Sequence, residues 1–487
     1  MYGDTDGTTA IELLRRIRAR EMSPTEILES TLASIERRNP SLNAFVHIGY
    51  EDARRQAAAV ERRLLSRGDD TRALDGVPTA IKDLYNFYPG WPSTFGGIPA
   101  LAKFHGAAKS NYPDRMEADG AVVVGATNSS LMGFRGTCDN PLFGPTRNPF
   151  DLERNSGGSS GGSAAAVSDG IIPVAGATDG GGSIRIPAAW CGVFGFQPSF
   201  GRVPILMQPN VFGATAPFVY EGPVSRTVSD AALVMTAIAG RHPADPFSLP
   251  DAVDWNAATQ RQIKGKVIGL TMDYGVFAVD PRIAAGVASA AKAFEEQGAA
   301  VVPIDVTLPA SQTQLSDLWC RMISAGSAAT INQFKAAGFD LMPELPTQLK
   351  HWVDQANSMT LAQLHADQVT RSRIFETLQR LLSQVDYIVA PTTGALAVPN
   401  ACDGDTLGPN HINGQQVNPL IGWCLTYLTN FTGHPAASVP AGLIDGLPFG
   451  MHIIGRMHAD ADVIAASARF EEARPWMGTY DARVRRD

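Results

Sequence analysis

Short apolar runs alternate with helix-like segments along most of this 487-residue chain. Runs such as Ala121–Gly125 are almost continuously apolar, which is typical of strands buried on both faces of a sheet. The same pattern predicts strands at 77–82, 121–125, 171–176, 267–271, 300–304, 387–390, 437–439 and 451–454. This alternation predicts an α/β layered fold with a largely buried sheet.

Helix-start signals stand between these runs and at both ends of the chain. Ser23 fits an N-cap and Glu26 stands three residues later, which makes a capping box. Asp280 marks another helix, which has a proline in its first turn and a stop at Gly298. The stretch from about 307 to 384 is mostly helical and carries no catalytic-looking cluster.

The chain shows no linker-like boundary and no internal repeat, and 44% of its residues are hydrophobic, which is enough for a packed interior. We therefore expect one large domain. Its boundaries are 1–487, with a core at about 70–240 and 385–475 and a cap-like helical region at about 307–384.

The composition argues against nucleic-acid and membrane partners. Lys and Arg number 40 and Asp and Glu number 48, a formal charge of −8, whereas nucleic-acid binding needs a basic face. No apolar run approaches the roughly 18–20 residues of a transmembrane helix, and no signal peptide is visible. The five cysteines form no CxxC pair, which argues against structural zinc and a disulfide framework. We expect a reduced, cytoplasmic protein.

Two glycine- and serine-rich stretches stand in the middle of the chain: N-S-G-G-S-S-G-G-S at 155–163 and T-D-G-G-G-S at 178–183. A flexible linker is disfavoured because both flanks look like protein interior. A phosphate-binding P-loop is disfavoured because no lysine follows these glycines. Residues 157–161 match the G-x-S-x-G elbow of α/β-hydrolases, but residues 151–156 are too polar for the core strand that the elbow requires.

A fourth interpretation combines two serines with a lysine. Ser159 and Ser183 lie 183 − 159 = 24 residues apart, joined by a predicted helix and strand that can return the chain to one site. Lys82 stands alone at the end of an apolar strand. Such a lysine ordinarily reaches solvent, but a lysine held in apolar surroundings loses proton affinity and can serve as a base.

These residues belong to a series of segments that resembles the amidase signature family of serine amidases. The resemblance extends over roughly residues 8 to 475, which is nearly the whole chain. It implies an α/β/α layered fold with a central, mostly parallel, twisted mixed sheet covered by helices. The segments are G-V-P-T-A-I-K-D (76–83), G-A-V-V-V-G-A-T-N (120–128), N-P-L-F-G-P-T-R-N-P (140–149), G-G-S-S-G-G-S-A-A-A-V (157–167), T-D-G-G-G-S-I-R-I-P-A-A-W-C-G-V-F-G-F-Q-P-S-F-G-R-V (178–203), S-V-P-A-G (438–442) and G-L-P-F-G-M-H-I-I-G (446–455).

The resemblance assigns the family's Ser–cis-Ser–Lys triad to three positions. Ser183 would be the nucleophile, Ser159 the bridging serine on a cis peptide bond, and Lys82 the base. Neutral Lys82 would draw a proton through Ser159 from Ser183, whose oxygen would attack a carbonyl carbon and form an acyl-enzyme. This chemistry needs no cofactor and no metal.

The neighbours of the nucleophile receive supporting roles from the same resemblance. The backbone N–H groups of Gly180, Gly181 and Gly182 would form an oxyanion hole, because glycine leaves room for N–H groups to point inward. Asp179 and Arg185 would act as structural support, as a buried ion pair, and not in the chemistry itself.

The substrate side departs from the family pattern. Many members carry Asp-Glu-Phe after the Thr-Asn pair at 127–128, whereas this chain continues Ser-Ser-Leu. By resemblance the stretch that follows lines the acyl pocket. Gly133, Phe134 and Arg135 are therefore the predicted substrate-side residues, with an ordinary surface loop as the open alternative.

Together these residues predict a stand-alone, cofactor-free hydrolase of small-molecule amides, acting on aliphatic or aryl acylamides as a monomer or homodimer. The resemblance extends this range to esters and carbamates (urethanes). The alternative is the glutaminase subunit of a tRNA-dependent amidotransferase, which needs a partner chain; Ile186 stands where that subunit usually has Gln. A catalytically silent binding protein would be expected to have lost a triad residue, and all three are present.

Overall fold

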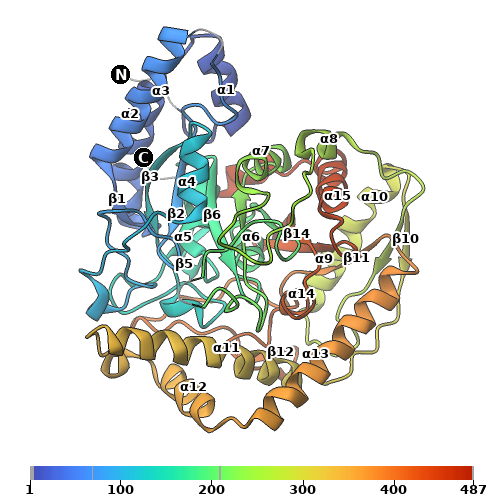
Figure 1. Cartoon of the computed structure of the whole chain (residues 1–487). Helices are drawn as coiled ribbons and strands as arrows, with labels where there is room; N and C mark the ends of the chain where they lie inside the picture. Colours follow the sequence, from blue (N-terminus) through green and yellow to red (C-terminus); the bar gives the residue numbers. More distant parts are fainter. Residues whose placement is uncertain (1–4, 68–69, 208–209, 485–487) are drawn as a thin grey trace.

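The structure is built on an eight-stranded mixed sheet that is continued at one edge by a three-stranded sheet (Figure 1). The computed structural model describes residues 5–67, 70–207 and 210–484. The strand orders are β10-β9-β11-β15-β14-β7-β8-β6 and β1-β3-β2, and β2 lies beside β6. The strands are β1 (Phe45–Ile48), β2 (Pro78–Lys82), β3 (Val122–Thr127), β4 (Arg147–Asn148), β5 (Asp151–Asn155), β6 (Val174–Asp179), β7 (Phe194–Gln197), β8 (Tyr220–Ser225), β9 (Val267–Leu270), β10 (Ala300–Pro303), β11 (Tyr387–Pro391), β12 (His411–Ile412), β13 (Gln415–Gln416), β14 (Ala436–Ile444) and β15 (Leu447–Ile454).

The α/β class and the mixed sheet are confirmed, but the large sheet is not mostly parallel. Among its described strands, only β10–β9 and β9–β11 are parallel neighbours, and the other five neighbouring pairs are antiparallel. Apolar runs do not settle the pairing, because a strand covered on both faces is apolar whatever the direction of its neighbour. A clearer signal is Asp445-Gly446 between β14 and β15, where both φ angles are positive (52° and 80°), as a type I′ hairpin turn requires.

Helices cover both sides of the sheets. In Figure 1, α1–α3 stand outside the small sheet, α7, α8 and α15 lie together, and α11–α13 form a layer along the opposite side. The helices are α1 (Ala10–Arg18), α2 (Pro24–Leu42), α3 (Tyr50–Arg67), α4 (Asn111–Ala118), α5 (Gly161–Ser168), α6 (Arg185–Cys191), α7 (Val228–Ile238), α8 (Trp255–Gln260), α9 (Pro281–Ala291), α10 (Ala293–Glu296), α11 (Gln312–Ala336), α12 (Thr347–Ser358), α13 (Leu361–Leu382), α14 (Tyr427–Thr432) and α15 (Asp460–Ala473), with 3₁₀ turns at Pro99–Leu101, Leu131–Gly133, Met342–Glu344 and Met477–Ala482.

The strand β11 shows how the two hydrophobic cores are separated. Ile388 and Ala390 pack into the core on the α11–α13 side, while Tyr387 and Val389 pack into the core that contains α7, α9 and α15. Successive side chains of a strand point to opposite faces, so burial on both faces needs an uninterrupted apolar run. The large sheet therefore forms a rigid layer between the two cores.

All eight strands predicted from apolar runs overlap strands of the structure, whereas β1, β7 and β8 of the two main sheets and the short β4, β5, β12 and β13 were missed. The strand β8 contains Gly222 and Pro223, residues that argue against a strand interior. The strand β7 is short and begins Phe-Gly-Phe. The region at about 307–384 is helical, as predicted, and contains α11, α12 and α13.

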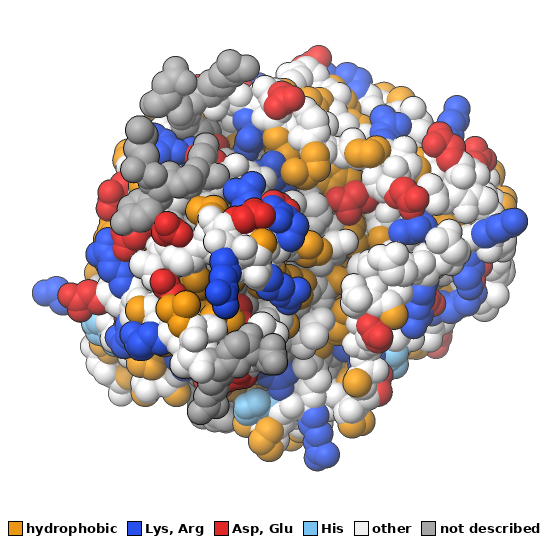
Figure 2. All heavy atoms as spheres, turned by 90° about the horizontal axis from the view of Figure 1, so that it is seen from above, with side chains coloured by type: hydrophobic (Ala, Val, Ile, Leu, Met, Phe, Trp, Pro, Cys, Tyr) orange, Lys and Arg blue, Asp and Glu red, His pale blue; other side chains and the backbone are white. Residues whose placement is uncertain are grey.

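Charged side chains of both signs are interspersed with apolar ones on the face seen in Figure 2. Neither sign gathers into a broad patch there, among the residues that are described. Over residues 5–67, 70–207 and 210–484, no helix combines the length and the apolar character that a membrane span needs.

The N-terminal helix α1 is attached to the main body through a buried carboxylate of α7. Asp230 accepts hydrogen bonds from the backbone N–H groups of Ala10 and Ile11, each at 3.1 Å. These are N–H groups of the first turn of α1, which have no partner within the helix. Thr227 caps α7 by accepting a hydrogen bond from Asp230 N–H at 3.1 Å, while the Asp230 carboxylate reaches α1.

We predict that Asp230→Ala lowers the free energy of unfolding by about 1–3 kcal/mol, because it removes the acceptor of the buried Ala10 N–H and of the Ile11 N–H. The measurement is the shift in the midpoint of urea unfolding, followed by circular dichroism. Asp254→Ala is the matched control, since Asp254 caps α8 at an exposed position. Equal shifts for the two variants would contradict a special role for the buried carboxylate.

Candidate active site

The side chain of Lys82 is buried at the junction of the two sheets. Lys82 is the last residue of β2, it is fully buried, and Thr127 at the end of β3 is its partner in the parallel register. Its Nζ lies 2.6 Å from Ser159 Oγ and 2.9 Å from Thr178 Oγ1, with the Thr178 carbonyl oxygen at 3.4 Å. Because β2 lies beside β6, the strand that carries Thr178, the sheet junction itself brings these groups together.

The contacts of Lys82 fit a neutral amine. Burial lowers the pKa of Lys82 to about 7, and the nearby Cys138 and Asp179 oppose this shift only in part. A neutral amine has two N–H donors and one lone pair. The carbonyl and hydroxyl oxygens of Thr178 can accept both N–H groups, so that the lone pair faces the Ser159 hydroxyl. The arrangement can therefore take a proton from Ser159.

Ser159 is held by its flanking backbone. The Gly158–Ser159 peptide bond is cis. Gly158 N–H donates to the carbonyl oxygen of Gly136 at 2.7 Å, and Ser130 N–H donates to that of Ser159 at 3.2 Å. A side chain at Gly158 would collide with the Thr137 backbone, so only glycine fits before Ser159.

Ser183 follows β6 in a tight turn and lies next to the segment that carries Ser159. Ser160 N–H donates to the Ser183 carbonyl oxygen at 3.3 Å, and both residues are buried. In the part of the chain that the structure describes, no side-chain hydrogen bond joins Ser159 to Ser183. The structure thus brings the side chains of Lys82 and Ser159 into direct contact. Ser183 is joined to the same segment by the backbone hydrogen bond from Ser160.

The glycine turn before Ser183 has only some of its N–H groups free. Gly182 N–H donates to Asp179 Oδ1 at 2.6 Å, so Gly182 is not the open oxyanion donor that we predicted. The Gly180 carbonyl accepts from Trp319 Nε1 at 2.9 Å, which turns the following Gly181 N–H the opposite way, since a trans peptide points its C=O and N–H groups in opposite directions. Among the described residues, no hydrogen bond occupies the N–H groups of Gly180, Gly181 or Ser183.

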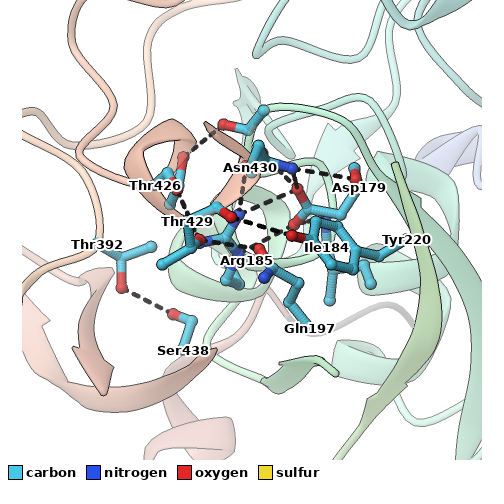
Figure 3. A network of polar contacts seen from close by, with 12 residues as sticks. Asp179, Ile184, Arg185, Gln197, Tyr220, Thr392, Thr426, Thr429, Asn430 and Ser438 are labelled. Carbon is cyan, nitrogen blue, oxygen red and sulfur yellow. Dashed lines mark hydrogen bonds and ion pairs between the residues drawn. The ribbon is translucent and has the colours of Figure 1, made fainter. Parts of the chain in front are cut away.

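Asp179 and Arg185 form a fully buried ion pair, with Arg185 Nε 3.0 Å from Asp179 Oδ2 (Figure 3). The second guanidinium edge reaches α14, where it donates to Thr429 Oγ1 at 2.7 Å and to Asn430 Oδ1 at 2.8 Å. Burial raises the pKa of Asp179, but the Arg185 charge together with the hydrogen bonds from Arg185, Asn430 and Ile184 outweighs burial and leaves the pKa below its usual value. The Asp179 carboxylate also accepts a hydrogen bond from Ile184 N–H at 3.0 Å, so the pair fixes the backbone on both sides of Ser183.

Of the three predicted substrate-side residues, Gly133, Phe134 and Arg135, only Gly133 lies next to the proposed triad. Gly133 does adjoin the site, since a Cβ added there would lie 3.4 Å from Ser159 Oγ. Phe134 is buried with its ring packed edge-on against Trp352. Arg135 is buried and ion-paired with Asp405, so its guanidinium is not available to a substrate. The prediction of a substrate-facing Arg135 is wrong, because loop 399–406 covers this stretch and supplies the charge partner.

A cavity of about 350 Å³ adjoins the buried lysine through Thr178. It also borders the glycine turn, because a Cβ added at Gly180 would lie 3.7 Å from Val219 Cγ2 and Val219 lines the cavity. We predicted none of the lining residues as part of a site, because they come from loops and from α4, β6, β8 and α11, which lie far apart in the sequence. The aromatic part of the lining consists of Tyr85, Phe87, Phe95, Phe104 and Phe334.

Comparisons with known proteins identify the family of this chain. The family model described as Amidase matches residues 26–464. An acylamidase of Rhodococcus erythropolis is 33% identical over 477 residues, covering 96% of both chains. The crystal structure of a bacterial aryl acylamidase of the amidase signature family has a TM-score of 0.96 and 49% identity, covering 98% of both chains.

A glutamyl-tRNA(Gln) amidotransferase subunit of Chloroflexus aggregans is 31% identical over 484 residues, covering 94% of both chains. The family match spans most of the chain, and the acylamidase is more similar than the amidotransferase subunit. This chain belongs to the amidase signature family of amide-hydrolysing enzymes.

We predict that Arg185→Met destabilises the protein by about 3–5 kcal/mol, because it leaves the Asp179 carboxylate buried without its charge partner. The readout is the thermal unfolding midpoint, measured beside the fraction of protein that is expressed in the soluble form. Arg282→Met is the control, since Arg282 pairs with Asp280 and Asp445 at the surface and its side chain is 55% exposed. A midpoint as high as that of the control variant would contradict a supporting role for the buried pair.

Proposed function

We propose that this chain is a stand-alone serine amidase in which Lys82, Ser159 and Ser183 transfer an acyl group from an amide to water. The observation that carries the proposal is the 2.6 Å contact between the buried Lys82 Nζ and Ser159 Oγ, next to the turn that presents Ser183. A serine hydroxyl is a weak nucleophile until a neighbouring base accepts its proton.

The first half of the reaction forms the acyl-enzyme. Ser183 Oγ attacks the amide carbonyl carbon while its proton passes to Ser159 Oγ, whose own proton passes to Lys82 Nζ. The tetrahedral intermediate carries a negative oxygen, which the free N–H groups of Gly180, Gly181 and Ser183 itself can stabilise. Gly182 is left out of this set because its N–H is held by Asp179.

The second half releases both products. Protonated Lys82 returns its proton through Ser159 to the departing nitrogen, the C–N bond breaks and the free amine leaves. A water molecule then attacks the ester carbon and gives its proton to the same relay. Ser183 is regenerated when the proton returns to its oxygen, and the carboxylic acid leaves.

Small acylamides with an aromatic group are the proposed substrates. The cavity of about 350 Å³ is of a size for small molecules and is lined on one side by aromatic rings. The relatives named acylamidase and aryl acylamidase support the same class. Esters and carbamates also have a carbonyl carbon that Ser183 Oγ could attack, and they are the secondary substrates to test.

We further propose that the whole chain acts as one amidase domain in the cytoplasm, as a monomer or homodimer, with 307–384 as a helical cap. The α11 helix supports the cap role, because several of its residues line the cavity. The competing function, a glutaminase subunit, is tested by assaying the purified chain on an anilide without a partner chain, tRNA or ATP. Turnover of the anilide supports the amidase, whereas activity that appears only with a partner contradicts it.

We predict that Ser183→Ala lowers amide hydrolysis by at least about 10⁴-fold, because it removes the attacking oxygen. Lys82→Ala is expected to cause a loss of similar size, since the two residues act in one relay. Release of aniline from acetanilide measures the rate, and circular dichroism verifies the fold of each variant. Substantial turnover by either folded variant would overturn the assignment.

We predict that kcat/KM falls as the pH drops below about 7, because burial lowers the pKa of Lys82 to about 7 and the relay needs the neutral amine. At higher pH Lys82 is deprotonated and the rate reaches a plateau. Glu221, whose pKa burial raises to about 7, could produce a similar limb, so the profile is repeated with Glu221→Gln. A profile that stays flat from pH 9 to pH 5 would contradict the role of Lys82 as base.

A further inference from the structure

A carboxyl group of the large sheet faces the cavity from β8, the strand next to β6, which carries Thr178. Glu221 of β8 is the register partner of Thr178 in β6, and both residues line the cavity. Directly opposed residues of neighbouring strands project from the same face of a sheet. The Glu221 side chain therefore lies beside the group that holds Lys82, and the proposed proton relay does not use it.

Two asparagine side chains, Asn86 and Asn111, lie near the Glu221 carboxyl group, and neither makes all the hydrogen bonds that it can. Asn86 and Asn111 also line the cavity, and their side chains lie close enough to Glu221 to favour its ionised form. Each is 4% exposed. Asn86 Oδ1 and Asn111 Nδ2 are buried and make no hydrogen bond of normal length among the described residues, although an N–H of Asn111 is the group that can favour the charge of Glu221. A buried polar atom without a hydrogen bond destabilises the fold, so two of them beside one cavity need an explanation.

The two unsatisfied atoms define the chemistry of the missing partner. One is an acceptor and the other a donor, so the partner must both donate and accept hydrogen bonds. A hydroxyl group does both, and so does a primary amide, whereas an ammonium group accepts none. The aromatic rings that line the remaining wall favour an aryl group as the carrier of this polar group.

We propose that Glu221, Asn86 and Asn111 form a specificity site that binds an uncharged hydrogen-bonding substituent, such as a hydroxyl group, on the aromatic ring of the substrate. The inference rests on the proposed amidase function and deepens it by naming the feature that selects among aryl amides. Binding at this site holds the ring in the cavity beside Thr178 and so positions the scissile amide near Ser183.

The first experiment uses the wild-type protein and compares acetanilide with its 2-, 3- and 4-hydroxy derivatives. We expect at least one hydroxylated substrate to have a kcat/KM about 10-fold higher than acetanilide, mainly through a lower KM, which corresponds to about one well-made hydrogen-bonding group. Equal values for all four substrates would overturn the proposal. A preference for an aminomethyl derivative over every hydroxylated one would overturn it too, because it would show a cation site.

The second experiment assigns the preference to these residues. Asn111→Leu and Asn86→Leu should reduce the hydroxyl preference by about 10-fold while changing kcat/KM for acetanilide much less. Glu221→Gln, which still donates and accepts hydrogen bonds, should keep most of the preference. Asn210→Leu is the matched control, since Asn210 lines the cavity at an exposed position. A preference that survives both asparagine changes would contradict the assignment.

The third experiment separates this inference from the proposed function. Calorimetry with Ser183→Ala measures binding of the hydroxylated and plain anilides without turnover. Tighter binding of the hydroxylated compound, lost in the double variant with Asn111→Leu, supports the site even if the chain hydrolyses neither compound. Equal binding of the two compounds overturns the inference while leaving an active amidase intact.

Discussion

One buried carboxylate organises the segment around the nucleophile position. Asp179 receives the N–H groups of Gly182 and Ile184 and the guanidinium of Arg185, all without contact with water. This set of bonds decides which amides of the glycine turn are left for an oxyanion. Because Arg185 also binds α14 (Figure 3), the turn is fixed to an element from the far end of the chain. A buried charge of this kind is tolerable only while all its partners remain in place.

The proposed base, Lys82, is also buried away from water, but there burial favours the neutral form and not the charged one. Within the described residues, no carboxylate pairs with Lys82, so burial disfavours its charged form, whereas Asp179 keeps its charge because Arg185 faces it. A neutral Lys82 and an ionised Asp179 can therefore coexist near pH 7. The two oxygens of Thr178 complete the arrangement, since they accept both N–H groups of a neutral lysine and direct its lone pair towards Ser159.

The sequence predicts strands that are apolar along their whole length, and it misses features that depend on contacts between residues far apart in the chain. Fully apolar strands such as β11 were found, whereas β8, with its glycine and proline, was not. The residues proposed for the reaction lie in short glycine- and serine-rich stretches and at one strand end, so local motifs reveal them. Arg135 was misjudged because its charge partner, Asp405, is 270 residues away and belongs to a loop with no recognisable pattern.

The same distinction explains why the proposed specificity site escaped sequence analysis. Asn86 follows β2, Asn111 begins α4 and Glu221 lies in β8, and only the folded chain brings them to one cavity wall. The antiparallel register of β6 and β8 is the decisive link, because it sets Glu221 opposite Thr178. A shift of one residue would turn Glu221 to the other face of the sheet and separate it from the cavity. Recognition and reaction are thus coupled by a single strand pairing, so a change in β8 can alter substrate choice while the groups that perform the chemistry stay in place.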